Sequence, residues 1–222
     1  MQARAEATRT AIVRAAAVVF NREGFTGART AEIVHEAAVS KGAMQFHFRT
    51  KEDLARAVID RFRREFDAAR SQPEYGSGIV AAVELSAAIA RQLAEEPIVG
   101  AAYRLTMEES VFAPRVTKPY GEMLSAVEGL LHRAAKEGEL RHGVSVTDLA
   151  RFVVASFIGV QSVSNTLTSR TDLIQRTADL WNYLLPSIAV PERVHDYMRV
   201  ARRTFGSHHT KSRTDLVVKG IL

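Results

Sequence analysis

Seven histidines are the side chains of this 222-residue sequence that could hold a metal ion or transfer protons. A zinc site on a helix needs its ligands at a fixed interval, as in His-Glu-x-x-His, and that interval does not occur. The chain also has no cysteine, no Gly-x-Ser-x-Gly turn and no glycine-rich phosphate loop. The sequence therefore predicts a protein that is not an enzyme and that carries neither a metal ion nor a cofactor.

Residues 29–51 contain polar side chains of another kind, which suit contact with DNA. Lys41 and Lys51 can neutralise phosphates, which adds affinity without sequence information, and His47 can do the same through a ring N–H. Gln45 can pair with adenine through two hydrogen bonds in the major groove, so it is our candidate for direct base readout. The predicted DNA-binding residues are Arg29, Thr30, Ser40, Lys41, Gly42, Ala43, Gln45, His47 and Lys51.

These side chains need two short helices joined by a tight turn, with the second helix presenting a polar N-terminus to the major groove. Residues 30–47 meet this requirement, because a tight turn at 37–39 separates two helical segments and Ser40 is a natural N-cap for the second. Phe46 and Phe48 are expected to anchor this second helix to the rest of the bundle. Residues 30–47 are therefore predicted to form a helix-turn-helix.

Helical spacing of hydrophobic residues continues along almost the whole chain, and no alternating strand pattern of useful length occurs. The predicted fold is all-α, with an N-terminal three-helix helix-turn-helix module followed by a C-terminal helical domain. Thr50 and Asp53 have the spacing of a capping box at the start of a fourth helix. Helices are expected at residues 3–22, 30–36, 41–47, 51–70, 79–95, 98–110, 120–137, 146–167 and 171–185.

The Pro, Gly and Ser residues of the segment 71–78 indicate a boundary between modules. Lys and Arg outnumber Asp and Glu near both ends of the chain, which favours a polyanionic partner. The basic residues from Arg199 onward are expected to form a frayed, solvated terminus. We assign residues 1–50 to a helix-turn-helix DNA-binding domain, 51–70 to a connecting helix, 71–205 to the C-terminal domain and 206–222 to a basic, flexible tail.

Composition favours the cytoplasm. No apolar run reaches the roughly 20 residues that a membrane span needs, and the first ten residues are polar, unlike a signal peptide. The absence of cysteine suits a reducing compartment. We therefore expect a cytoplasmic protein with no membrane partner.

The residues of the predicted helix-turn-helix also carry a family resemblance. They resemble the signature of the TetR family of transcriptional repressors at residues 24–25, 32–34, 37–43, 46–48 and 51–54. Within that family, the segments 41–48, 157–164 and 184–191 are similar to the γ-butyrolactone autoregulator receptors of actinomycetes. The resemblance implies a ligand-responsive repressor, a homodimer that binds a pseudo-palindromic operator in double-stranded DNA and is released by a small effector of the γ-butyrolactone type.

Four positions depart from this family pattern. Ala38 stands where relatives usually have Gly, and a left-handed Ala there would cost on the order of 1 kcal/mol. Gln45 stands in place of Tyr, and Arg29 in place of Thr, where it is expected to add a phosphate contact. Met123 stands where the butyrolactone receptors usually have a pocket Trp, so a pseudo-receptor that senses an antibiotic or a biosynthetic intermediate is an alternative.

The resemblance also assigns ligand binding and dimerisation to the C-terminal domain. Its last two predicted helices carry more apolar surface than one core stripe needs, which favours a four-helix dimer interface with Trp181 and Leu185, although Trp181 fits a cavity equally well. Gln161 is polar inside an apolar helix and needs a partner, which a ligand can provide. The predicted ligand-binding residues are Leu85, Ile89, Arg104, Leu105, Met123, Val127, Phe152, Ser156, Val160, Gln161, Ser164 and Trp181.

Two further alternatives keep the same fold. One is an activator, and the other is a regulator that responds to no small ligand. Neither the operator sequence nor the regulated genes follow from the residues, and selection of bound DNA from a random pool is the experiment that would define the half-site.

Overall fold

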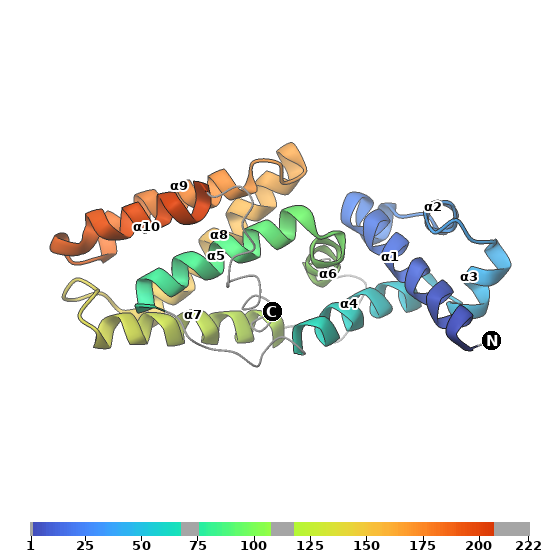
Figure 1. Ribbon diagram of the computed structural model, residues 1–222, viewed down its shortest axis with the longest axis horizontal. Coiled ribbons are helices and arrows are strands. Elements are labelled where there is room, and N and C mark those ends of the chain that lie inside the picture. Colours follow the sequence, from blue (N-terminus) through green and yellow to red (C-terminus); the bar gives the residue numbers. More distant parts are fainter. Residues whose placement is uncertain (1, 68–75, 108–117, 207–222) are drawn as a thin grey trace. The chain divides into compact units, whose positions relative to one another are not determined.

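The computed structural model describes residues 2–67, 76–107 and 118–206 (Figure 1). Helices form the whole of the regular structure in these ranges, apart from a single antiparallel bridge between Leu140 and Ala189. The predicted all-α fold is therefore confirmed. The helices are α1 (Gln2–Gly27), α2 (Thr30–Glu36), α3 (Lys41–His47), α4 (Lys51–Asp67), α5 (Gly78–Glu95), α6 (Pro97–Met107), α7 (Lys118–Lys136), α8 (Val146–Thr168), α9 (Leu173–Ile188), the short 3₁₀ helix η1 (Pro191–Arg193) and α10 (Val194–Gly206).

The chain forms two compact units. Unit 1 comprises Met1–Glu65 together with Glu95–Val116, and unit 2 comprises Phe66–Ala94 together with Thr117–Leu222. This division differs from the continuous C-terminal domain expected at 71–205, because α6 belongs to the unit that holds the N-terminal helices. Most of the basic tail expected at 206–222 lies outside the described residues.

Unit 1 is built around α1, whose apolar face is buried. Ile12, Ala16 and Phe20 are fully buried, and Leu105 of α6 shares this core. α1 does not end at the predicted residue 22, because Gly24 takes a left-handed conformation (φ 71°) and the helix continues to Gly27 beyond the resulting kink. Glycine adopts this conformation without the steric cost of a Cβ atom.

Local capping defines the starts of α3 and α4, as predicted. The Ser40 hydroxyl accepts a hydrogen bond from the Ala43 N–H at 3.1 Å, which caps α3. The Asp53 carboxylate accepts from the Thr50 N–H at 3.1 Å, and the Thr50 hydroxyl accepts from the Asp53 N–H at 3.0 Å, which is a reciprocal capping box. Ala38, between α2 and α3, is left-handed (φ 51°), so the expected departure from glycine does strain this turn.

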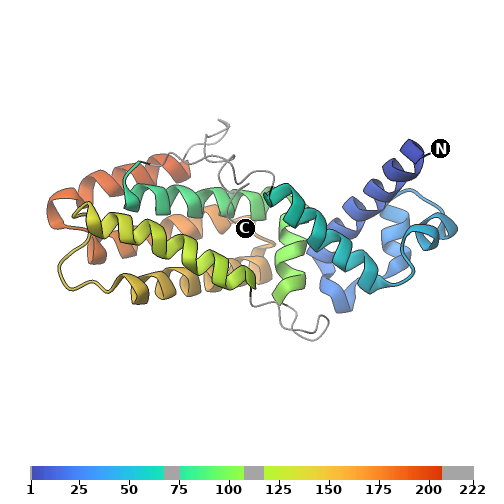
Figure 2. The ribbon, with the colours of Figure 1, turned by 90° about the horizontal axis from the view of Figure 1, so that it is seen from below.

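Unit 2 packs α5, α7, α8, α9 and α10 around one apolar core (Figure 2). Figure 1 shows α9 and α10 side by side. Two predictions about this region are wrong. The helix expected at residues 171–185 does not end before Pro186: α9 includes this proline and continues to Ile188, because Ile188 is buried and the Ala189 N–H still donates to the Leu185 carbonyl at 3.0 Å.

The second error concerns residues 199–206, which were expected to be frayed and are helical. It belongs to α10, which buries Tyr197, Ala201 and Phe205 on one face. Their four-residue spacing is a helical signal that was present in the sequence. Packing of this face against the core holds the helix in place.

A buried carboxylate fixes the start of α5. Glu139 is fully buried, and one of its oxygens accepts a hydrogen bond from the Ile79 N–H at 2.9 Å. Arg193 forms an ion pair with the other oxygen at 3.5 Å, as a buried charge requires. Burial, and secondarily Glu139, raise the pKa of the adjacent Tyr197 to about 12. Gly78 permits the close approach, since a Cβ there would clash with the backbone of α7.

Candidate DNA-binding and effector sites

The second helix of the helix-turn-helix, α3, has one buried side and one exposed side. Met44 is buried, and it anchors the helix to the core of unit 1 together with Phe48, which follows the last turn. Lys41, Gly42 and Gln45 are exposed. The predicted base-reading and phosphate-binding side chains of α3 are therefore accessible to a partner, whereas Ala43 and His47 are half-buried.

Phe46 is also exposed, which corrects the expectation that it anchors α3. Its side chain is 82% exposed, whereas Phe48 is only 4% exposed, with the Arg9 guanidinium 5.1 Å from its ring centroid. The reason is helical geometry: residue 46 is two positions from Met44 and points to the opposite side. The four-residue spacing of Met44 and Phe48 was the sequence signal for this arrangement. Phe46 therefore joins the exposed face of α3.

The side chain of Lys51, at the start of α4, is half-buried and has partners within the protein. Its ammonium donates to the Ala28 carbonyl at 3.0 Å and lies 3.5 Å from the Thr26 carbonyl oxygen. The same ammonium is 4.6 Å from the Phe25 ring centroid, within the range of a cation–π interaction. Lys51 thus ties α4 to the segment that joins α1 and α2, a role that the sequence did not indicate.

That segment leads directly into the exposed start of α2. Arg29 occupies the N-cap position with extended backbone and makes no side-chain cap, and Thr30 is exposed beside it. Arg29 and Thr30 are therefore accessible, as their predicted roles require.

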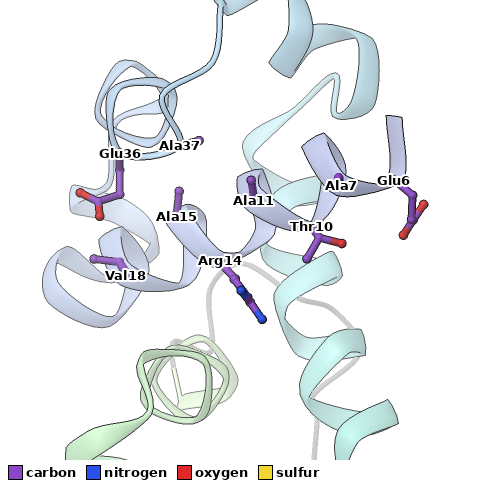
Figure 3. A pocket seen from close by; sticks show the side chains of 9 residues that line it. All are labelled: Glu6, Ala7, Thr10, Ala11, Arg14, Ala15, Val18, Glu36 and Ala37. Carbon is purple, nitrogen blue, oxygen red and sulfur yellow. The ribbon is translucent and has the colours of Figure 1, made fainter. Parts of the chain in front are cut away.

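An open groove of about 780 Å³ lies along α1 near the end of α2 (Figure 3). Its lining includes a series of small residues of α1, among them Ala11 and Ala15, and the side chain of Arg14. Glu6 and Glu36 lie at opposite ends of the groove in Figure 3. Because these two carboxylates would repel phosphates, the groove does not suit the DNA backbone, and none of the predicted site residues lines it.

Two of the predicted effector-binding residues belong to unit 1. Arg104 donates from Nη1 to the carbonyl oxygens of Asn21 and Arg22, at 3.1 and 2.8 Å. Leu105 is fully buried in the core that α6 shares with α1. Both side chains therefore have structural partners in the unit that carries the helix-turn-helix.

The other predicted effector-binding residues lie in unit 2. Met123, Val127 and Trp181 belong to one buried cluster, and Leu85 and Ile89 are buried on α5. The structure thus gathers Met123, Val127 and Trp181 from two helices that are far apart in sequence.

The indole of Trp181 makes a buried polar contact that the sequence did not predict. Its N–H donates to the Ser86 hydroxyl at 2.6 Å, and that hydroxyl donates to the Val83 carbonyl at 2.8 Å. Trp181 and Leu185 are both fully buried within the protomer, so the expectation that they form the dimer interface is wrong. Their spacing of four residues places them on the inner face of α9.

The polar residues of α8 have different surroundings. Gln161 is 3% exposed, and its Oε1 atom has no hydrogen-bond partner within the described parts of the chain. Ser164 donates to Asp172 at 2.6 Å, and this bond, followed by one from Thr168, lowers the pKa of Asp172 to about 2. Ser156 is half-buried. Ser164 therefore has a hydrogen-bond partner at the start of α9, whereas Oε1 of Gln161 has none among the described residues.

Helices α8 and α9 both carry exposed apolar residues, which we call the exposed apolar stripe. Phe152, Val163 and Leu167 of α8 are 54%, 47% and 67% exposed, and Tyr183 of α9 is 83% exposed. Phe152 therefore lies on this stripe and not in the core, whereas Val160 is half-buried. With apolar residues on two sides, α8 has the length and composition of a membrane-spanning helix, and 33% of its most apolar stretch is buried.

Comparison with known protein families identifies the family of this chain. Residues 12–58 match the model of bacterial regulatory proteins of the TetR family, and residues 76–191 match the C-terminal domain of tetracycline-repressor-like proteins. The chain belongs to the TetR family. The predicted resemblance is thus confirmed, and this TetR-family protein is a transcriptional regulator and not an enzyme.

Several characterised relatives are similar over most of this TetR-family chain. The A-factor receptor protein of Streptomyces griseus is 35% identical over 86% of the chain and 67% of its own length. The repressor BepR of Brucella suis is 30% identical over 69% of the chain and 78% of its own length. CprB of Streptomyces coelicolor, solved in complex with its operator, superposes with a TM-score of 0.80 at 29% identity, covering 92% and 100% of the two chains.

Proposed function

We propose that this TetR-family regulator is a repressor that binds a pseudo-palindromic operator as a homodimer and is released by a small effector of the γ-butyrolactone type. The observation that carries the proposal is the exposed face of α3, where Lys41, Gln45 and Phe46 project from a helix held by Met44 and Phe48. Such a face fits the major groove, with the helix N-terminus toward the bases. CprB, a relative with this fold, was solved bound to its operator.

In this proposal the residues of the face divide their tasks. Lys41 and Lys51, with Arg29 and His47, neutralise phosphates, which gives affinity on any sequence. Gln45 reads adenine through its amide. Ser40 holds the start of α3, so that the exposed residues meet the groove in a fixed register. Thr30, Gly42 and Ala43 complete the surface of contact.

Dimerisation is supported by the exposed apolar stripe of Phe152, Val163, Leu167 and Tyr183. Two copies can bury this stripe by pairing their α8 and α9 helices as a four-helix interface. A two-fold symmetric dimer carries two reading helices, which explains why its operator should be pseudo-palindromic. We place the working protein in the cytoplasm, since it acts on DNA and would bury its most apolar helix in this interface.

The effector is proposed to bind in unit 2, near Met123, Val127, Gln161 and Trp181. The similarity to the A-factor receptor and to solved γ-butyrolactone receptors of the ArpA-like type supports a lactone. Met123 favours a different effector, because this flexible side chain stands where the butyrolactone receptors are expected to have Trp. A pseudo-receptor that senses an antibiotic or a biosynthetic intermediate is therefore our second candidate.

The test combines selection of bound DNA from a random pool with sedimentation and release. We expect a two-fold symmetric site, a dimer at micromolar concentration, and release of the site by micromolar γ-butyrolactones. A monomer that protects an asymmetric footprint would contradict the dimeric repressor. Release by aromatic antibiotics and not by lactones would favour the pseudo-receptor, and Met123→Trp should then shift the preference toward lactones.

A further inference from the structure

The amide of Gln161 stands apart from the other buried polar groups of the described residues. Its Oε1 atom is buried without a hydrogen-bond partner. The remaining residues that share this property each make another hydrogen bond, ion pair, ring contact or electrostatic interaction. Buried polar groups in folded proteins are nearly always paired, and an exception calls for a functional explanation.

Gln161 also lies where an apolar residue is expected. The buried stripe of α8 runs through Val153, Val154 and Phe157 to Gln161 and Ser164. A side chain on such a stripe contributes to the core, and an unpaired amide weakens the core by the free energy of its lost hydration. Leucine or methionine would fill the same volume without this cost.

Three other buried residues of unit 2, Ser164, Thr177 and Trp181, already use their side-chain donors in hydrogen bonds. The Ser164 hydroxyl donates to Asp172, and the Thr177 hydroxyl donates to the Leu173 carbonyl at 2.8 Å. The Trp181 indole donates to Ser86. Each of these donors would have to break an existing bond in order to reach Gln161. Because Oε1 of Gln161 has no partner among the described residues, we expect a bound ligand to provide it.

We propose that Gln161 accepts a hydrogen bond from a hydroxyl group of the effector and so selects hydroxylated lactones over their ketone counterparts. A hydroxyl can donate to the unpaired Oε1, whereas a ketone oxygen is an acceptor only and would face a second acceptor. The unpaired amide destabilises the free protein, and a hydrogen bond from the effector removes this destabilisation in the complex. This inference rests on the proposed effector site in unit 2.

The first arm of the test needs no effector. Gln161→Leu should raise the Tm of the protein by about 2–4 °C, since it removes an unpaired buried group. Thr177→Val is the matched control, because Thr177 is fully buried but its hydroxyl is paired, and its Tm should not rise. Protomer concentrations are kept equal, because the Tm of a dimer depends on them. A clear fall in Tm for Gln161→Leu would show that the amide is paired in solution and would overturn the proposal.

The second arm measures the concentration that releases half of the bound operator. The probes are a γ-butyrolactone with a hydroxyl on the side-chain carbon next to the ring, and the matching ketone. We expect the hydroxyl form to act at an about tenfold lower concentration on the wild type and on Thr177→Val, and the two forms to act alike on Gln161→Leu.

The outcomes separate the two proposals. Equal potency of both lactones on the wild type would overturn the role of Gln161 and leave the proposed lactone response in place. A preference for hydroxyl that persists in Gln161→Leu would also overturn it. Failure of both lactones to release the operator would overturn the lactone response itself, together with the selection of hydroxylated lactones.

Discussion

The Nη1 nitrogen of Arg104 in α6 donates a hydrogen bond to the backbone carbonyl oxygen of Arg22 in α1, 2.8 Å away. The bond lies just before the kink of α1 at Gly24. α6 follows α5 after a single residue, Glu96, and yet it belongs to unit 1 while α5 belongs to unit 2. The chain therefore passes through α6 directly from unit 2, where we propose that the effector binds, into the unit that carries the helix-turn-helix.

Arg104→Met is expected to uncouple the two sites. It removes the charged donor that joins α6 to the carbonyl oxygens of α1 and keeps most of the aliphatic stem. We expect the effector to weaken operator binding at least fivefold less than in the wild type, measured as the ratio of operator Kd values with and without saturating effector. Arg91→Met is the control, because Arg91 of α5 also donates to a helix carbonyl, that of Thr204, but within unit 2. An unchanged ratio in Arg104→Met would contradict this role.

Lys41 and Lys51 should respond differently to replacement by Met. Both changes remove a proposed phosphate contact and should reduce the salt dependence of operator binding by about one charge. Only Lys51→Met also removes the internal bond to Ala28, so only it should lower the Tm. The measurements are binding titrations at several salt concentrations and thermal unfolding. A salt slope that stays at the wild-type value in Lys51→Met would restrict Lys51 to its internal contacts.

Phe46 and Phe48 provide a matched pair of aromatic residues on opposite sides of α3. Phe48→Ala should cost about 3–5 kcal/mol of unfolding free energy, because the ring is buried. Phe46→Ala should change that free energy by no more than about 0.5 kcal/mol and yet weaken operator binding about tenfold. Urea unfolding and operator titration separate these effects. Full operator affinity in Phe46→Ala would remove this residue from the DNA-binding face.

Ala38→Gly should stabilise the protein by about 1 kcal/mol. Ala38 is left-handed, and glycine adopts this backbone conformation without the clash of a Cβ atom. The neighbouring Ala37 has right-handed helical backbone, so Ala37→Gly should instead destabilise, by about 0.5–1 kcal/mol. Urea unfolding of both variants measures the difference. Destabilisation by both glycines would show that the turn is not strained in solution.

The lowered pKa of Asp172 predicts that this residue contributes to stability in a pH-dependent way. Hydrogen bonds from Ser164 and then Thr168 lower its pKa from 3.8 to about 2. Because the folded-state pKa is the lower one, its stabilising effect is complete above the unfolded value and is lost as the pH falls from 3.8 toward 2. The Tm gap between the wild type and Asp172→Asn should therefore be constant above about pH 5 and should shrink below pH 4. Asp179→Asn, which alters an exposed carboxylate bonded to Gln175, should show a smaller gap at every pH.

The sequence by itself determined the elements that depend on neighbours along the chain. The bounds of α2 and α3, the Ser40 cap and the reciprocal pair of Thr50 and Asp53 were predicted correctly, because these contacts join residues three or four positions apart. The family followed from the same local signature. A left-handed backbone at Ala38 could also be expected from the sequence, since the family pattern places glycine at that turn.

Only the tertiary structure decided which residues meet across the chain. It places α6 against α1, so that Arg104 binds carbonyl oxygens 82 and 83 residues away, and it pairs Trp181 with Ser86. It also leaves Gln161 without a partner among the described residues. Helical periodicity shows that a face is apolar, but it does not show which helix covers that face. That choice depends on the packing of the whole chain, because burial and hydrogen bonding between distant segments are set by shape and not by spacing.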